Sequence, residues 1–89
     1  MSGKPRIISG IVRDSKGQPV GDARVYFIGG PVPLPDVAVL TDKTGRFTLS
    51  APTTGAYTIQ CAAEGFATAT VTVDVTSTQD MQVVIRLKK

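Results

Sequence analysis

The stretch "ATATVTVDV", residues 67–75, carries the clearest pattern in the chain. Alanine and valine alternate with threonine and aspartate, so the pattern repeats every two residues, as in a β-strand, and not every 3.6 residues, as in a helix. A strand with one apolar and one polar face is half-buried. The stretch therefore predicts a strand that packs one face on a core and exposes the other to water.

The same period of two runs through the rest of the chain, and no segment has the start and stop signals of a helix. The other residues expected to face inward are Ile8, Gly10 and Val12; Ala23, Val25 and Phe27; Val37 and Val39; Phe47 and Leu49; Tyr57, Ile59 and Cys61; Met81, Val83, Ile85 and Leu87. Seven short strands separated by turns are typical of an immunoglobulin-like sandwich. We therefore expect an all-β, seven-stranded Greek-key sandwich of the prealbumin type. It forms a single domain over residues 1–89, with strands within about 7–87 and tails at 1–6 and 88–89.

Two turns between the strands have the same chemistry. Residues 14–17 read Asp-Ser-Lys-Gly, and residues 42–45 read Asp-Lys-Thr-Gly. An aspartate at the first position accepts hydrogen bonds from the backbone of its own turn, and a glycine three residues later adopts a positive φ without strain. Calcium binding would need further carboxylates at ligand spacing, which neither turn has. We interpret both as turns between strands.

Composition excludes several kinds of site. The chain has one cysteine, Cys61, and no histidine, so it can form neither an internal disulfide nor a zinc site of cysteines and histidines. Its net charge of +3 comes largely from basic residues near the ends, and such tails lack the clustered stripe of a nucleic-acid footprint. No apolar run reaches the length of a signal peptide or a membrane span. We expect no metal, no cofactor, no nucleic-acid partner and no membrane insertion.

Three segments together resemble a known family. They are "SGIVRDSKGQPVGDARV" (9–25), "TDKTGRFTL" (41–49) and "GAYTIQCAAEGF" (55–66). Their shared features are a Gly-x-Val-x-Asp opening, a Gly-x-Pro turn, a Thr-Asp-x-x-Gly-x-Phe hairpin and a Gly-x-Tyr segment that ends near Gly-Phe. This combination resembles the carboxypeptidase regulatory-like domain, a transthyretin-like β-sandwich, and the resemblance extends from about Ile8 to Leu87.

The resemblance implies a fold and an accessory role. Domains of this kind accompany peptidases, receptors and secreted or cell-surface proteins, and similar domains occur in the spike-tip proteins of contractile secretion systems and phage tails. We therefore expect a non-catalytic module that binds another protein or a neighbouring domain. The family implies an extracytoplasmic or exported place, whereas the lack of a signal peptide favours the cytoplasm if the chain is complete.

Enzymes with related sandwiches use residues that this chain lacks. Hydroxyisourate hydrolases use histidines and a C-terminal Tyr-Arg-Gly-Ser segment, and intradiol dioxygenases bind iron through histidine and tyrosine. Here histidine is absent, and the chain ends in Arg86-Leu87-Lys88-Lys89. Without a histidine base, Cys61 also lacks the partner that would activate it as a nucleophile. We expect no enzymatic activity and name no catalytic residue.

The unusual segment is "GGPVPLPDVAV", residues 29–39, in which three prolines alternate with apolar residues. Prolines at this density exclude a strand and stiffen a loop, but their spacing of two does not match the three-residue repeat of polyproline II. In one interpretation Val32 and Leu34 cover an end of the core. In the other, residues Val32, Pro33, Leu34 and Pro35 dock on a partner protein, because loops of a sandwich carry recognition. Both interpretations remain open.

Three further binding modes follow from outward-facing residues. The polar positions Arg46, Thr48, Thr58, Gln60, Thr68, Thr70 and Thr72 are expected to form one hydroxyl-rich face. Tyr26 is the single aromatic expected to point outward, on a different strand. Carbohydrate binding at the threonine face or near Tyr26 is therefore the alternative function. The segment 68–75 is also long enough, and rich enough in β-branched residues, to accept an added strand at a sheet edge.

Overall fold

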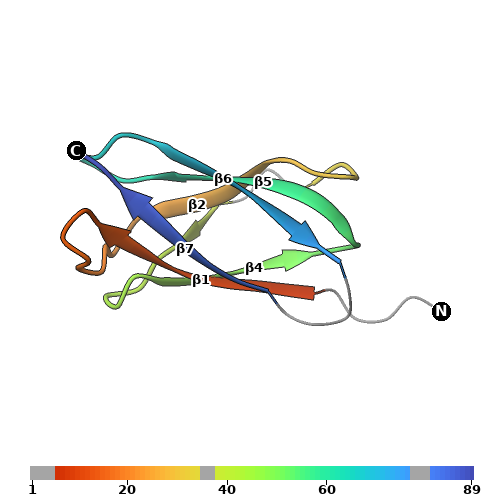
Figure 1. The fold of residues 1–89 in the computed structure, drawn as a ribbon, viewed down its shortest axis with the longest axis horizontal. Coiled ribbons are helices and arrows are strands. Elements are labelled where there is room, and N and C mark those ends of the chain that lie inside the picture. Colours follow the sequence, from red (N-terminus) through yellow and green to blue (C-terminus); the bar gives the residue numbers. More distant parts are fainter. Residues whose placement is uncertain (1–5, 35–37, 77–80) are drawn as a thin grey trace.

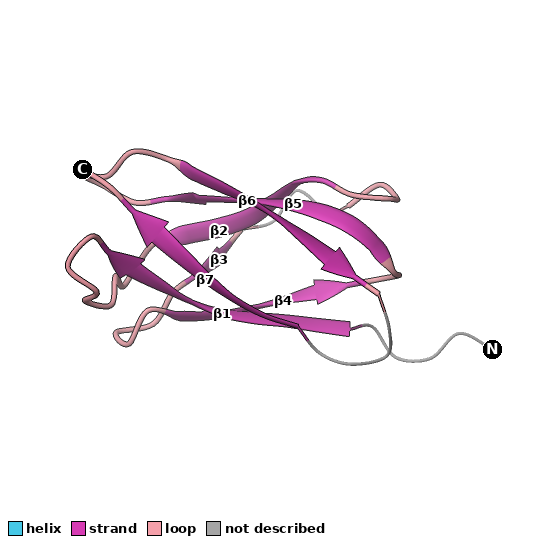
Figure 2. Ribbon diagram, viewed as in Figure 1, coloured by secondary structure: helices cyan, strands magenta, loops and turns pink. Residues whose placement is uncertain are grey.

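The structure of the protein, a computed structural model, describes residues 6–34, 38–76 and 81–89. These residues form seven strands and no helix (Figures 1 and 2). The strands are β1 (Arg6–Asp14), β2 (Arg24–Gly29), β3 (Val39–Leu40), β4 (Arg46–Ala51), β5 (Gly55–Ala62), β6 (Ala69–Val75) and β7 (Met81–Leu87). Accordingly, no helix in these three ranges is long and apolar enough to cross a membrane.

The strands pair into two sheets that face each other. A three-stranded sheet has the order β4-β1-β7, in which β1 is antiparallel to β4 and parallel to β7. A four-stranded sheet has the order β3-β2-β5-β6, and all its pairs are antiparallel. Figure 1 shows the two layers, with β1 and β4 in one and β2 and β5 in the other. The predicted all-β sandwich is confirmed.

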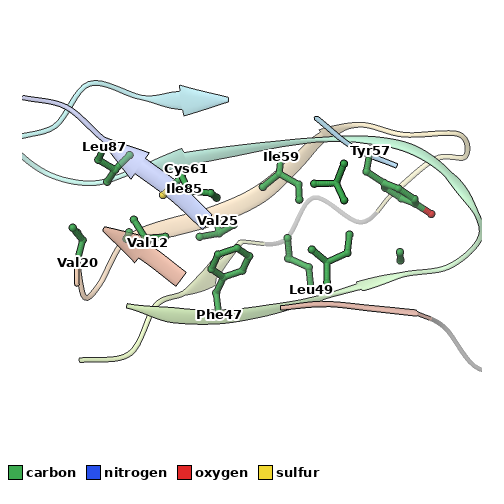
Figure 3. Close-up of a cluster of buried hydrophobic side chains, with 14 of the residues drawn as sticks. Val12, Val20, Val25, Phe47, Leu49, Tyr57, Ile59, Cys61, Ile85 and Leu87 are labelled. Atoms are coloured by element: carbon green, nitrogen blue, oxygen red, sulfur yellow. The ribbon is translucent and has the colours of Figure 1, made fainter. Parts of the chain in front are cut away.

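The core fills the space between the two sheets (Figure 3). Phe47 and Leu49 of β4 point toward the four-stranded sheet, while Ile59 and Cys61 of β5 point back at them. Every second residue of β4 and β5 is buried, as the alternation predicts. The fully buried side chains include Ile8, Val12, Val25, Tyr57, Ile59, Cys61, Val75, Ile85 and Leu87.

Two strand boundaries differ from expectation. β6 begins at Ala69, so Ala67, predicted to face inward, is exposed and lies in the turn after β5. The Ala67 N–H donates to the carbonyl of Lys88 over 2.7 Å. Ala67 therefore bonds to the chain after β7 and takes no part in the β5–β6 ladder. The predicted strand around Val37 and Val39 consists of Val39–Leu40, and Val37 lies outside the described residues.

A tight contact between neighbouring strands joins Gly10 and Phe47, which are paired in the β1–β4 ladder. A Cβ at position 10 would lie 2.5 Å from Cζ of Phe47 and 2.7 Å from the carbonyl oxygen of Val83 on β7. Glycine therefore lets the Phe47 ring occupy the middle of the sheet, where it is 4% exposed. The Gly-x-Val and Gly-x-Phe motifs thus meet at one contact.

The two predicted turns have the expected hydrogen bonds. Oδ1 of Asp14 accepts from the backbone N–H groups of Lys16 and Gln18, each over 2.9 Å. Oδ1 of Asp42 accepts from the N–H groups of Thr44 and Arg46 and from the Thr44 hydroxyl. Gly17 and Gly45 have φ values of +82° and +78°, which a side chain would resist. The interpretation of these residues as turns is confirmed.

A buried threonine connects the second turn to the β1–β2 connection. The Thr41 hydroxyl donates to the carbonyl of Val20 over 2.8 Å and accepts from the N–H of Ala23 over 2.9 Å. Position 45 has no space for a side chain, because a Cβ on Gly45 would lie 2.5 Å from the carbonyl oxygen of Val12. These contacts hold the two turns together at one end of the sandwich.

We predict that Gly10→Ala lowers the free energy of unfolding by about 1–3 kcal/mol, because overpacking of this size forces neighbouring atoms to move. Chemical denaturation measures the loss. Gly29→Ala is the matched control, since a Cβ there would meet Thr58 at an ordinary 3.7 Å. Equal stability of Gly10→Ala and the wild type would show that the Phe47 contact does not limit the sheet.

Candidate functional site

The proline loop, defined here as residues 30–34, lies at the end of β2 and divides its apolar side chains between core and solvent. Leu34 packs against the core cluster, whereas Val32 is 38% exposed. A Cβ at Gly30 would lie 2.8 Å from Cδ1 of Leu34 and 3.1 Å from Cδ2 of Tyr57, so these two side chains converge on Gly30. Leu34 therefore covers an end of the core. Val32 and Pro33 remain at the surface.

The loop rests on a rigid base. Tyr57 is fully buried, and its hydroxyl donates to the carbonyl of Thr53 over 2.7 Å and accepts from the Thr53 N–H over 3.2 Å. The Phe27 ring lies 5.1 Å from the Tyr57 ring, centroid to centroid. Pro31 packs against Gly55, where a Cβ would lie 2.7 Å from the proline Cγ. The turn between β4 and β5 thus packs against the proline loop.

The exposed side of the loop is apolar. Ile28, at the end of β2, is 51% exposed and adjoins a surface hollow of about 500 Å³. The residues that line this hollow are Phe27, Ile28, Gly29, Gly30, Pro31, Val32, Pro33 and Leu34. Pro35, also predicted for this site, lies outside the described residues. The structure brings Val32, Pro33 and Leu34 together and adds Ile28, whose place in the site the alternation pattern does not reveal.

Tyr26 lies elsewhere, in the middle of the outward face of the four-stranded sheet. It is paired with Gln60 on β5, and Gln60 is paired with Thr70 on β6. The Tyr26 hydroxyl donates to Oε1 of Gln60 over 2.7 Å, which holds the half-buried ring along the sheet. The next row across the sheet pairs Thr58 with Thr72. An aromatic ring, an amide and threonine hydroxyls therefore share this face.

The single hydroxyl-rich face predicted from alternation is wrong. Arg46 and Thr48 belong to β4 in the three-stranded sheet, whereas Thr58 and Gln60 belong to β5 in the four-stranded sheet. The outward faces of the two sheets point in opposite directions across the core, and Thr68 lies in the turn before β6. Alternation shows on which side of a strand a residue lies, but the side-chain pattern does not show which sheet receives the strand.

The outward face of the three-stranded sheet gathers basic residues that lie far apart in the sequence. Arg13 on β1 is paired with Arg86 on β7, and Arg46 on β4 is paired with Ile11 on β1. A shallow hollow of about 670 Å³ on this sheet includes Arg13, Arg46, Ile11 and Val84 in its lining. The sequence pattern did not reveal this cluster, because it depends on the pairing of three strands.

The titratable groups with shifted pKa values, Cys61, Asp14 and Asp42, have structural roles. Burial raises the pKa of the Cys61 thiol to about 11, so the fully buried sulfur stays protonated at neutral pH. The hydrogen bond from the Gln18 N–H lowers the pKa of Asp14, and the hydrogen bond from the Thr44 hydroxyl lowers the pKa of Asp42. In residues 6–34, 38–76 and 81–89 no three histidine, cysteine, aspartate or glutamate side chains group to hold a metal ion.

Comparison with known proteins identifies a family over nearly the whole chain. The model of the carboxypeptidase regulatory-like domain family matches residues 7–88. No curated protein is significantly similar to the chain in sequence. The similarity to solved structures is therefore one of fold, at identities below 20%.

Three solved structures show how widely this fold is used. A Streptococcal ancillary pilin matches with a TM-score of 0.74 and 15% identity, over 100% of this chain and 34% of the pilin chain. The 3-chlorocatechol 1,2-dioxygenase of Rhodococcus opacus 1CP matches with a TM-score of 0.73 and 18% identity, over 99% of this chain and 61% of the enzyme. A candidate carbohydrate-binding protein from Pseudomonas aeruginosa matches with a TM-score of 0.66 and 18% identity, over 97% and 90% of the two chains. This chain thus spans about a third of the pilin and less than two thirds of the dioxygenase, and the three names belong to different functional classes.

We predict that Cys61 reacts with a thiol reagent at mildly alkaline pH only after the protein unfolds, because the thiol is buried and protonated in the native state. Release of the chromophore from Ellman's reagent measures the rate. The control is Cys61→Ala/Thr70→Cys, which carries its single thiol at an exposed position on β6 and should react at once.

The raised pKa of Cys61 also determines the direction in which stability changes with pH. An unfolded thiol ionises near its ordinary value of 9.0, whereas the folded one holds its proton to about 11. The contribution of Cys61 to stability is therefore complete below pH 9 and is lost as the pH rises through 11. Rapid labelling of the native wild-type protein would contradict the expected inertness of the thiol, and a stability that stays constant between pH 9 and 11 would contradict the expected pH dependence.

Proposed function

Because the chain belongs to the carboxypeptidase regulatory-like domain family, we propose that it is a non-catalytic accessory module that binds another protein or a neighbouring domain. The observation that carries the proposal is the exposed apolar surface around the proline loop. Its most exposed large residues are Ile28 and Val32, on a base fixed by Tyr57. A rigid apolar loop binds at low cost in conformational entropy, so this surface suits protein docking.

The non-catalytic part of the proposal rests on the side chains present. The similarity in fold to a dioxygenase does not imply the same activity, because histidine is absent from the whole sequence. The two tyrosines are engaged elsewhere, Tyr57 with Thr53 in the core and Tyr26 with Gln60 on the four-stranded sheet. The buried thiol of Cys61 is protonated, and Asp14 and Asp42 hold turns, so none of these groups is placed as a nucleophile or base.

The docking surface consists of Ile28, Val32 and Pro33, with Leu34 as its support. Leu34 does not project toward a partner, because it covers the core beside Gly30. A partner would therefore contact the outer edge of the loop and the end of β2. Pro33 is exposed and conformationally restricted, and it lines the same surface hollow as Ile28 and Val32.

We predict that Val32→Ser/Ile28→Ser abolishes capture of the partner protein while leaving the protein folded, because both side chains are partly exposed and lie outside the buried core cluster. Affinity capture from an extract of the source organism, followed by mass spectrometry, compares this variant with the wild type. Leu40→Ser is the control, since Leu40 is 62% exposed but lies on β3 and outside the loop. Undiminished capture by the double variant would remove the loop from the interface.

The same comparison separates docking from core support. Leu34→Ser should lower the unfolding temperature, because it exposes the core beside Tyr57. A Leu34→Ser protein as stable as the wild type would show that Leu34 is free to serve the partner after all.

Carbohydrate binding is the second candidate function, and the position of Tyr26 favours it. The ring lies on the same face as Gln60 and Thr70, whereas the sequence pattern did not place an aromatic among these hydroxyls. Aromatic surface next to amide and hydroxyl groups offers a sugar both an apolar contact and hydrogen bonds. The hydrogen bond to Gln60 also fixes the ring before any ligand arrives.

For this second function we predict glycan binding that falls at least about tenfold in Tyr26→Ala, the loss expected for about 1.4 kcal/mol of contact. A glycan array followed by titration calorimetry measures it. Tyr26→Phe keeps the ring and removes the hydrogen bond to Gln60, so it separates stacking from orientation. Binding unchanged in Tyr26→Ala, or no glycan bound by the wild type, would dismiss carbohydrate as the ligand.

A further inference from the structure

We propose that the outward face of the three-stranded sheet, around Arg13, Arg46 and Arg86, is a docking surface for an acidic protein segment. This arginine face differs from the proline loop in place and in chemistry. The proline loop follows the end of β2, next to Gly55 and beyond the end of β4, whereas Arg46 begins β4. The two surfaces therefore lie at opposite ends of the sandwich, and either can function without the other.

The pairing of the strands assembles the arginine face. Ile11 in the central strand has Arg46 on one side and Val84 on the other. The next outward residue of β1, Arg13, is paired with Arg86. Neighbouring strands lie about 4.8 Å apart, so the apolar pair Ile11 and Val84 has Arg46 beside it in the same row and Arg13 and Arg86 in the next row.

The outward positions of the described strands give this face one sign of charge. Among the described residues that point outward from β4, β1 and β7, the charged side chains are Arg13, Arg46 and Arg86. Arg13 and Arg86 are paired across the parallel β1–β7 ladder, so two positive charges lie on neighbouring strands. Carboxylates of a partner would complement these charges, which gives the surface a preference for acidic ligands.

Two described carboxylates lie in the turns beside this face, and both hold their turns. Asp42 precedes Arg46 and interacts with its charge, while its Oδ1 accepts three hydrogen bonds from Thr44 and from the Arg46 backbone. Asp14 accepts from the backbone of its own turn in the same way. Arg13 donates through one nitrogen to the carbonyl of Gly17 over 2.7 Å, which orients its guanidinium and leaves further donors for a ligand.

The choice of arginine over lysine also indicates recognition. All five arginines of the chain lie in strands, whereas the described lysines are in turns or at the C-terminus. Arginine binds a carboxylate with two parallel hydrogen bonds and is enriched in protein interfaces, from which lysine is depleted. Charge needed only for solubility would not require this distribution.

The apolar centre favours a protein over a nucleic acid. Val84 is 57% exposed and Ile11 is half-buried beside it, and together they offer contact for an aliphatic side chain between two carboxylates. Outward positions on the described strands of this sheet carry no aromatic ring on which a base could stack. The shallow hollow of about 670 Å³ on this sheet provides a concave surface for such a segment.

The test is a fluorescence-anisotropy titration of the 89-residue protein with a labelled polyglutamate peptide that has one central leucine, at physiological ionic strength. Arg46→Gln and Arg86→Gln should each weaken binding by about two- to fivefold, the range expected for one exposed ion pair. Arg24→Gln is the matched control, because it removes the same charge from an exposed position on the other sheet, and it should change binding by less than about twofold. Val84→Ser should weaken the leucine peptide but not a peptide with serine in its place, and Leu40→Ser should affect neither.

Each other outcome overturns the proposal. Equal losses in Arg24→Gln and Arg86→Gln would show attraction to net charge alone. Tighter binding of a DNA duplex, insensitive to Val84→Ser, would assign the face to a polyanion. Absence of saturable binding by the folded wild type would remove the site. None of these results bears on capture through the proline loop.

Discussion

The ring of Phe47 occupies the space beside Gly10 in which any side chain would collide, and this contact fixes the middle of the three-stranded sheet. β1 is the central strand of that sheet, so its close approach to both neighbours depends on the absence of a Cβ at position 10. The Thr41 hydroxyl and the tight approach of Gly45 to Val12 then secure the turns at one end. These residues belong to the motifs by which the sequence resembles the family, and each has a structural reason to be there in this chain. The motifs therefore contribute to the sandwich itself.

The pattern of alternation predicts the interior well and the surface poorly. It correctly predicts that Phe47, Ile59 and Ile85 face the core, because burial of one face fixes the side of each strand. It does not predict that Thr48 and Thr58 lie on opposite sides of the molecule, since long-range pairing decides which sheet contains a strand. The arginine face is missed for the same reason. A stiff loop at residues 30–34 follows from the prolines, because proline stiffness is local, whereas the contact of Leu34 with Tyr57 beside Gly30 depends on packing that the sequence does not show.

The two proposed docking surfaces differ in chemistry. At one end a stiff apolar loop presents Val32 and Ile28, and at the other a basic sheet face presents arginines near Val84. An apolar docking element contributes affinity, whereas a charged face contributes orientation and the rate of encounter. Two surfaces of different chemistry at opposite ends suit a module that connects two parts of a larger assembly. A catalytic role would instead require groups that converge on one cleft.

We expect buried motif residues to hold the fold and outward-facing residues to select the partner. Two-dimensional amide NMR of the uniformly labelled protein, titrated with the acidic peptide, tests this division residue by residue. We predict shifts confined to the outward-facing positions around Ile11, Arg46, Val84 and Arg86, with the signals of Tyr57 and Ile59 unchanged. Shifts centred on Tyr26 and Gln60, or spread through the core of both sheets, would contradict it.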